Sequence, residues 1–171
     1  MSGKYKYLYL YLALACLLGI ILIFVFDGYI GVYDTLTVKS GEMPLVITAD
    51  QWRNQDRSGF FPTVSVNYGD EAAFNYEIAN RRFFADKEEI TVSVWQNDNQ
   101  IDQLLDRTTD TGAFGKETIN WSFQPSKYFG PASQNSYTEY TVMIKRGSIE
   151  RKILIQVPPA GGVIKVIPPG K

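Results

Sequence analysis

The chain has 171 residues with 17 basic and 18 acidic side chains, and it contains no histidine and a single cysteine. The missing histidine excludes Ser-His-Asp and Cys-His catalysis and imidazole metal ligands, and a lone cysteine forms no intramolecular disulfide. A balanced charge without a basic stripe argues against nucleic-acid binding. We therefore expect no catalytic residue set, no metal site and no cofactor, and we predict a binding or structural role.

A long apolar run near the N-terminus predicts a membrane-spanning helix. Residues 7–26 carry no charged side chain, and at about 1.5 Å per residue a helix of this length is about 30 Å long, the thickness of the bilayer core. The run is longer than that of a cleavable signal peptide and has no clear cleavage site before Asp27, so we expect a retained signal anchor. Cys16 follows Ala13-Leu14-Ala15, a faint lipobox, but the apolar run continues beyond it, and we interpret Cys16 as a lipid-facing residue.

The charges on either side of this run predict its orientation. Lys4 and Lys6 precede it, whereas Asp27 and Asp34 follow it. Positively charged flanks stay on the cytoplasmic side of a membrane. We therefore expect residues 1–6 in the cytoplasm and the following domain on the extracytoplasmic side of the cell membrane.

Beyond residue 31 the apolar pattern changes from continuous to alternating. Apolar side chains at every second position are typical of half-buried strands. This pattern predicts about eight strands, in the runs Val32–Val38, Leu45–Thr48, Thr63–Val66, Phe74–Ile78, Ile90–Val94, Ile119–Phe123, Tyr140–Ile144 and Ile153–Val157. Residues 31–157 are thus expected to form one antiparallel β-sandwich. At the level of the fold this resembles an immunoglobulin-like or fibronectin-III-like module, although the Cys…Trp…Cys signature of true immunoglobulin domains is missing.

Turn-forming residues separate the expected strands. Asn67–Asp70 precedes the strand through Phe74, and Asn97–Asn99 follows the strand through Trp95. Arg146-Gly147-Ser148 joins the last two long strands and predicts a hairpin.

The region that follows Asn97–Asn99 has no strand pattern. Its apolar residues have the spacing of a single helical turn, at Ile101, Leu104 and Leu105. From that turn onward acids recur every four residues, at Asp98, Asp102, Asp106 and Asp110. Closely spaced acids can bind Ca²⁺, but the EF-hand spacing is absent, so we expect a solvated hairpin and loop instead.

The C-terminal residues 158–171 are rich in proline and glycine and are expected to form a tail after the last strand. Within this tail Val163–Ile167 is apolar. Such a segment can pair as an edge strand, either on this domain or on a partner.

Loops that combine aromatic and cationic side chains are the candidate contact sites. Arginine and aromatic residues are enriched at the energetic centres of protein interfaces. The candidates are Arg81, Arg82, Phe83 and Phe84 in one loop, with Phe60, Phe61, Trp52, Tyr128 and Phe129 elsewhere. Two interpretations remain open: the rings cap the ends of the sandwich, or at least one pair touches a partner or the membrane surface. For Trp52 the alternatives are a core-capping ring and a ring that stacks on a sugar or a partner.

Two further sites have weaker support. A two-carboxylate hydrolase needs acids that face each other across a cleft, and the acids Glu77, Glu88, Glu89 and Glu117 are available. Asn120-Trp121-Ser122 matches the N-glycosylation sequon. It lies in an expected strand, with Asn120 pointing outward.

The combination of a short anchor and a β-sandwich predicts an interaction module on the outer side of a membrane. Only the residues from Asp27 to Gly31 are expected to separate helix and sandwich. We therefore expect an accessory or structural subunit of a membrane or cell-envelope complex, with the lipid bilayer, a membrane or envelope protein, or a second copy of the chain as its partners. The alternatives are a glycan- or solute-binding receptor domain and a membrane-tethered carboxylate hydrolase.

Overall fold

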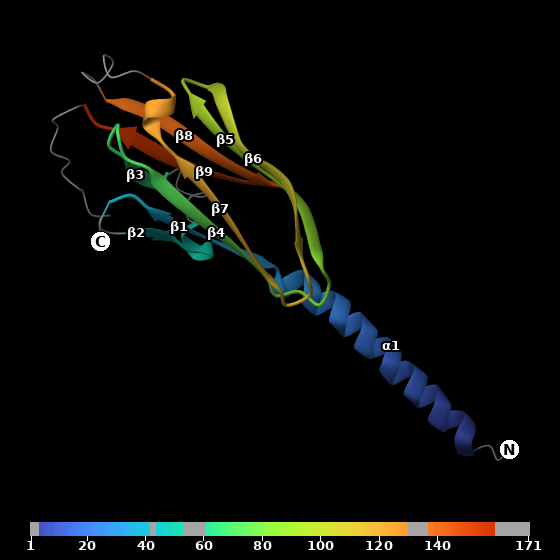
Figure 1. Ribbon diagram of the computed structural model, residues 1–171. Helices are drawn as coiled ribbons and strands as arrows, with labels where there is room; N and C mark the ends of the chain where they lie inside the picture. Colours follow the sequence, from blue (N-terminus) through green and yellow to red (C-terminus); the bar gives the residue numbers. More distant parts are fainter. Residues whose placement is uncertain (1–3, 42–43, 53–60, 130–136, 160–171) are drawn as a thin grey trace.

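A computed structural model describes residues 4–41, 44–52, 61–129 and 137–159 of the chain. One apolar helix, α1 (Lys4–Ile30), projects from one end of a β domain that consists of two sheets (Figure 1). The stretch Tyr7–Asp27 is long and apolar enough to cross a membrane, and none of it is buried inside the protein. The helix thus contains the whole predicted span, residues 7–26, and extends past both of its ends.

The connection between helix and β domain is shorter than the sequence predicts. The structure is helical as far as Ile30, and β1 (Val32–Lys39) begins directly after Gly31. The prediction that Asp27 to Gly31 form a tether outside the helix is therefore wrong, except for Gly31, because Asp27 to Ile30 belong to α1. Gly31 has a φ of +69°, a left-handed conformation that glycine adopts without the steric cost of a Cβ atom.

The first sheet contains four antiparallel strands in the order β2-β1-β4-β7. Besides β1, its strands are β2 (Pro44–Ile47), β4 (Ala72–Asn80) and β7 (Lys116–Phe123). On β4 every second side chain from Ala72 to Asn80 is buried, which is the alternation expected of a strand with one face on a core.

The second sheet contains five strands in the order β3-β9-β8-β5-β6. They are β3 (Thr63–Ser65), β5 (Asp86–Gln96), β6 (Asn99–Thr111), β8 (Thr138–Arg146) and β9 (Ile149–Val157). Pairing is antiparallel except between β3 and β9, which run parallel. The two sheets bury their facing sides against each other as a sandwich, and the described residues contain nine strands in all.

Each of the predicted strands is present, and one strand was missed. The region with Ile101, Leu104 and Leu105 was expected to form a helical turn, but it lies in β6, which pairs with β5 along its length. That prediction is wrong because β-bulges shift the β5–β6 register twice, between Val92 and Ser93 and between Val94 and Trp95. Bulges change which side chains face the core, so apolar and polar residues do not alternate regularly in the sequence of β6.

The predicted turns are confirmed. The Asp70 N–H donates to the Asn67 carbonyl at 3.1 Å, and β8 and β9 form the hairpin across Gly147. Asn97 and Asp98 both have positive φ, as the tight turn between β5 and β6 requires. The predicted edge segment Val163–Ile167 lies outside the described residues.

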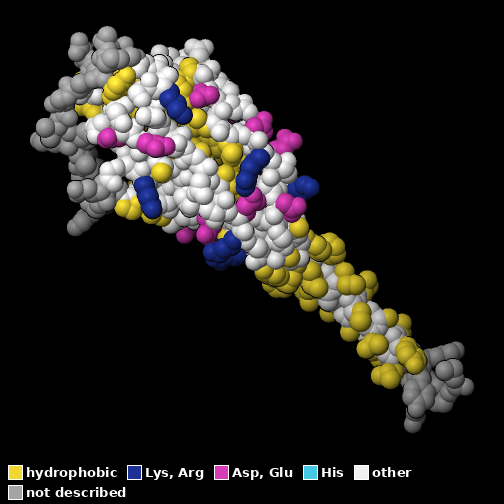
Figure 2. All heavy atoms as spheres, in the orientation of Figure 1, with side chains coloured by type: hydrophobic (Ala, Val, Ile, Leu, Met, Phe, Trp, Pro, Cys, Tyr) yellow, Lys and Arg dark blue, Asp and Glu magenta, His cyan; other side chains and the backbone are white. Residues whose placement is uncertain are grey.

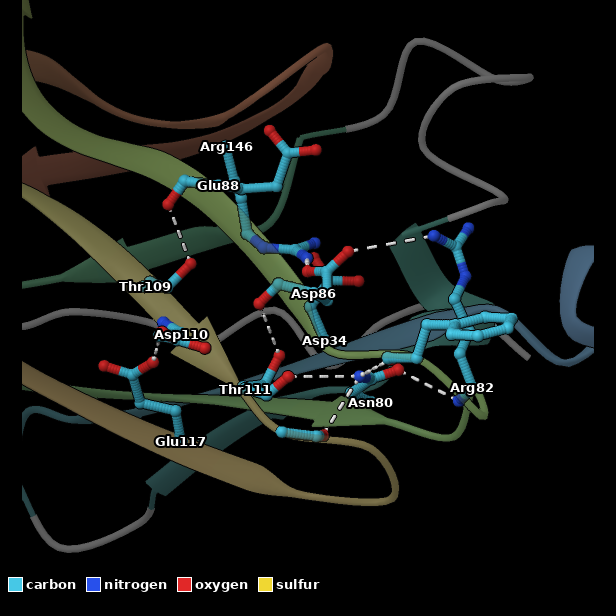
Figure 3. A network of polar contacts seen from close by, with 12 residues as sticks. Asp34, Asn80, Arg82, Asp86, Glu88, Thr109, Asp110, Thr111, Glu117 and Arg146 are labelled. Carbon is cyan, nitrogen blue, oxygen red and sulfur yellow. Dashed lines mark hydrogen bonds and ion pairs between the residues drawn. The ribbon is translucent and has the colours of Figure 1, made fainter.

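The interior of the sandwich is apolar along most of its length and charged at one end. Most of it is aliphatic and aromatic, but the end nearer α1 contains buried ion pairs. Arg151 on β9 donates to Asp34 on β1 at 3.0 Å, which links the two sheets, and the Tyr76 hydroxyl donates to the same carboxylate at 2.9 Å. Arg146 forms an ion pair with Asp86 within the second sheet (Figure 3). A buried charge is tolerated only when it is paired in this way.

Candidate functional site

Two loops meet at the end of the sandwich that α1 enters, residues 81–85 between β4 and β5 and residues 112–115 between β6 and β7 (Figure 1). Asn80, the last residue of β4, holds them together. Its side-chain amide donates to the carbonyls of Phe84 at 2.8 Å, Gly112 at 3.1 Å and Thr111 at 3.2 Å. Its side-chain oxygen accepts the Arg82 N–H at 2.9 Å. Because Asn80 is buried, its hydrogen bonds are shielded from competing water.

Backbone hydrogen bonds add to this connection. The Phe114 N–H donates to the Arg82 carbonyl at 3.2 Å, and the Asn80 N–H donates to the Gly115 carbonyl at 2.9 Å. Phe114 has a φ of +54°, a conformation that costs a residue with a Cβ about 1–2 kcal/mol. The two loops therefore form one unit that holds the Phe114 ring outward despite this cost.

Helix α1 and the residue that follows it contact the β4–β5 loop at three positions along the helix axis. The rings of Phe24 and Phe84 stack with their centroids 5.3 Å apart. One turn further along, the Asp27 carboxylate accepts the Phe83 N–H at 2.6 Å. Beyond the helix end, the Gly31 carbonyl accepts the Arg81 N–H at 3.3 Å. A charge-assisted bond, a ring stack and a backbone bond together fix the sandwich relative to the helix.

The same loops expose a cluster of rings, which we name the aromatic collar: Phe83, Phe84 and Phe114. Their side chains are 41%, 46% and 61% exposed, and Phe83 meets Phe114 edge to face with centroids 5.1 Å apart. In Figure 2 the hydrophobic side chains of α1 continue onto the end of the sandwich that the helix enters. Phe114 has no adjacent ring or cation in the sequence, where Gly112, Ala113 and Gly115 surround it. Its left-handed backbone and the hydrogen bond from its N–H to Arg82 place it in this cluster.

The two arginines of the loop lie beside the collar. The Arg81 guanidinium lies over the Tyr33 ring, with its central carbon 4.7 Å from the centroid, a distance typical of a cation–π contact. The Arg82 guanidinium lies 3.7 Å from the Asp86 carboxylate, on the side opposite Arg146 (Figure 3). Loop 81–84 is thus the candidate of the sequence analysis that the structure brings to the surface as a single cluster.

The other aromatic candidates have different positions. Trp52 is fully buried, with the Arg151 guanidinium over its ring at 5.4 Å. A buried indole cannot reach a partner, so the interpretation of Trp52 as a stacking surface is wrong. Phe61 is 44% exposed, away from the collar, and Phe60 lies outside the described residues.

Tyr128 and Phe129 cover the end of the core away from α1. Tyr128 stacks on Phe123 with centroids 5.3 Å apart, and Phe129 stacks on Tyr140 at 6.3 Å. The Tyr128 hydroxyl donates to Asp102 at 2.7 Å. Burial, with this hydrogen bond and the charge of Asp102, raises the pKa of the Tyr128 phenol above its usual range. These two rings match the capping interpretation.

The acidic residues do not gather into a metal site within the described residues, where no group of three or more Cys, Asp or Glu side chains is placed to hold an ion. The hydrolase candidates Glu77 and Glu117 point to opposite faces of the first sheet, since Glu77 pairs with Thr118 and Ile78 with Glu117. Glu77 is bound by Lys116, and Glu117 by Arg107.

A shallow groove of about 290 Å³ crosses the outer face of the second sheet. It is lined by Trp95, Asn97, Asp98, Glu139, Thr141, Met143, Lys152 and Leu154. The Trp95 indole N–H donates to the Ser93 hydroxyl at 2.8 Å, and this hydrogen bond orients the ring. Trp95 was not among the residues selected from the sequence. It could have been found there, because it is one residue past the alternating buried positions Val92 and Val94 and so faces outward.

The sequon residue Asn120 is exposed on the outer face of the first sheet, where its side-chain oxygen accepts a hydrogen bond from Asn75.

Comparisons with known proteins do not identify a family. No protein-family model matches the chain, and no curated protein matches its sequence. Among solved structures, a cycloisomaltooligosaccharide glucanotransferase from Paenibacillus sp. shares 14% identity with a TM-score of 0.42, over 55% of this chain and 12% of that one. A β-glucosidase from Listeria innocua shares 13% identity with a TM-score of 0.44, over 74% of this chain and 16% of that one. The chain thus corresponds to a small part of these enzymes, and likeness at this level carries no argument about activity.

Proposed function

We propose that this protein is a membrane-anchored interaction module, an accessory or structural subunit of a membrane or cell-envelope complex. The observation that supports it best is the rigid connection between an apolar helix and a β-sandwich. Only Gly31 separates α1 from β1, and Phe24 and Asp27 of the helix bind the β4–β5 loop. A helix that crosses the bilayer would therefore present the sandwich in one orientation, as a subunit with a fixed place in an assembly requires.

The direction of insertion follows from the helix flanks. Lys4 and Lys6 precede the apolar run, and Asp27 ends it. The positive-inside rule then favours a cytoplasmic N-terminus and an extracytoplasmic sandwich. Its partner in this proposal is a membrane or envelope protein, or a second copy of the chain.

The strand order supports an immunoglobulin-like subtype for the sandwich. In that fold, strands B and E are in one sheet and strands C, F and G are in the other. Here β4 and β7 are neighbours in the first sheet, whereas β5, β8 and β9 are consecutive in the second. We infer that these five strands correspond to B, E, C, F and G, in that order.

Purification of the full chain from its native membrane in mild detergent tests the proposed subunit role. We expect a membrane protein, or a second copy, to co-purify in a fixed ratio. Insertion of Gly-Ser-Gly-Ser between Gly31 and Val32 frees the sandwich from the helix and should reduce this ratio. The same insertion after Gly69, in the exposed Asn67–Asp70 turn, is the control and should leave the ratio unchanged. A chain that purifies alone as a monomer contradicts the proposal.

A glycan- or solute-binding receptor domain is the second candidate, and the groove at Trp95 favours it. Aromatic rings stack on sugars, and Asn97, Asp98 and Glu139 provide polar groups around this ring. Calorimetric titration of the full chain with a panel of oligosaccharides should show saturable binding that Trp95→Ala abolishes and Phe61→Ala leaves intact. No binding across the panel would remove the glycan form of this candidate.

A further inference from the structure

The aromatic collar lies at a depth that α1 itself determines. Phe84 stacks on Phe24, and Phe24 belongs to the apolar stretch Tyr7–Asp27, which the proposed function places in the bilayer. Phe83 donates its N–H to Asp27, the last residue of that stretch. When the helix spans the bilayer, the rings of Phe84 and Phe83 therefore lie at the edge of the hydrocarbon core and not above it.

We propose that the aromatic collar of Phe83, Phe84 and Phe114 is a lipid-contact surface that lies in the interfacial layer of the bilayer. This inference rests on the proposed membrane anchor and names the occupant of the exposed collar. Aromatic rings favour the interface between hydrocarbon and headgroups. The three rings are between 41% and 61% exposed, so the bilayer covers apolar surface that water would otherwise contact.

The position of Arg81 agrees with this depth. Its N–H binds Gly31, which lies about 6 Å beyond Asp27 at the rise of a helix. The headgroup layer extends about 5–8 Å beyond the hydrocarbon core on each side. The Arg81 backbone therefore lies within the headgroup layer, and its guanidinium, which lies over Tyr33, is on the aqueous side of the hydrocarbon edge. Aromatic rings at the hydrocarbon edge and a cation on its aqueous side together form an interfacial anchor.

The bilayer fits this surface better than a soluble protein. The Phe84 ring contacts the helix inside its apolar stretch, where a soluble partner cannot reach it without entering the membrane. Asp27, an acid at the same boundary, already has a backbone donor in Phe83, which lowers the cost of placing its charge there. The loops therefore fit a lipid environment in both their apolar and their polar groups.

Tryptophan substitutions in the collar measure its depth in the bilayer through fluorescence quenching. The full chain with Phe84→Trp, Phe83→Trp or Phe114→Trp is reconstituted into phosphatidylcholine vesicles whose acyl chains carry bromine, a short-range quencher. The matched control is Tyr137→Trp, because Tyr137 is also an exposed ring (64%). It precedes β8, which runs antiparallel to β5 and so starts at the end of the sandwich away from α1. Of the three natural tryptophans, Trp52 and Trp121 are buried in the sandwich, and Trp95 lies near the end of β5 away from α1. Their emission is the background, which is measured with the parent chain in the same vesicles and subtracted.

We expect brominated lipid to remove most of the fluorescence that Phe84→Trp and Phe83→Trp add, with a blue-shifted emission, and to leave that of Tyr137→Trp unchanged. Phe114→Trp should be quenched to a smaller extent. Flotation with the vesicles tests the anchor separately. If the chain floats but the collar tryptophans are quenched by aqueous iodide and not by bromine, the lipid-contact inference is overturned and the anchor stands. A chain that does not float overturns both.

Discussion

At the scale of single residues, Tyr76 shows how a polar side chain is accommodated in the core. Its hydroxyl donates to Asp34 at 2.9 Å, and that carboxylate also accepts from Arg151. Burial, then the charge of Asp34 and this hydrogen bond, raise the pKa of the Tyr76 phenol above its usual range. The neutral phenol is therefore the form that the folded protein requires.

Tyr76→Phe should lower the free energy of unfolding by about 1–2 kcal/mol, because it removes a buried hydrogen bond to a charged group. Urea unfolding of the full chain in detergent, followed by Trp fluorescence, measures this change. Tyr140→Phe is the control, since the buried Tyr140 hydroxyl makes no hydrogen bond within the described part of the chain. Equal losses in the two variants would contradict the importance of the Asp34 contact.

The raised pKa values also predict instability in alkali. An unfolded tyrosine ionises at about pH 10, whereas burial raises the pKa of Tyr76 and of Tyr140 in the folded chain. Above that pH the unfolded state loses protons that the folded state keeps, so stability is intact below about pH 10 and falls as the pH rises further. Tyr76→Phe should make this fall shallower in unfolding curves measured at increasing pH. An unchanged slope would contradict the prediction.

At the scale of elements, Asn80 connects the ends of four strands. It closes β4 and bonds to the loops that lead into β5 and from β6 to β7. Asn80→Ala should lower the free energy of unfolding by about 2–3 kcal/mol, since it leaves buried backbone carbonyls without donors. Asn75→Ala, on the exposed face of the same strand, should cost less than about 1 kcal/mol in the same urea titration. If both variants cost the same, Asn80 does not hold the loops together.

The β8–β9 hairpin depends on Gly147. Its φ is +53°, and a Cβ atom built there would lie 2.4 Å from the Glu88 carboxylate. Gly147→Ala should therefore cost about 1–2 kcal/mol in backbone strain, and the Glu88 side chain must also move. Gly69→Ala has open space and no positive φ, so its melting temperature should remain close to that of the parent chain. The prediction fails if Gly147→Ala melts at the same temperature as Gly69→Ala.

At the scale of the whole molecule, the two sheets are joined both by an apolar core and by the Asp34–Arg151 ion pair. Arg151→Met should lower the free energy of unfolding by about 3–5 kcal/mol, because Asp34 is left as a buried unpaired charge. The double variant Asp34→Leu with Arg151→Met removes both charges and should recover much of this loss. Lys152→Met removes a surface ion pair with Glu150 and should cost less than about 1 kcal/mol. No recovery in the double variant would contradict the charge argument.

The location of the exposed aromatic loop residues is also a property of the whole molecule. Phe83 and Phe84 were candidates from the sequence because an arginine pair precedes two adjacent rings. Tyr128 and Phe129 had a similar composition, yet they pack on the core, and Trp52 is buried. Composition alone could not separate these groups, because a loop-borne ring either covers the end of a core or remains exposed, depending on the space that the packed strands leave.

The amino-acid sequence by itself determined the apolar helix and all but one of the strands. These elements depend on the order of apolar and polar residues within short segments, at the periods of a helix or a strand. Only the tertiary structure decided that β6 is a strand, that Phe114 joins Phe83 and Phe84, and that Gly31 alone separates α1 from β1. These features depend on bulges, on a left-handed backbone and on contacts between residues far apart in the chain, and none of these leaves a periodic pattern in the sequence.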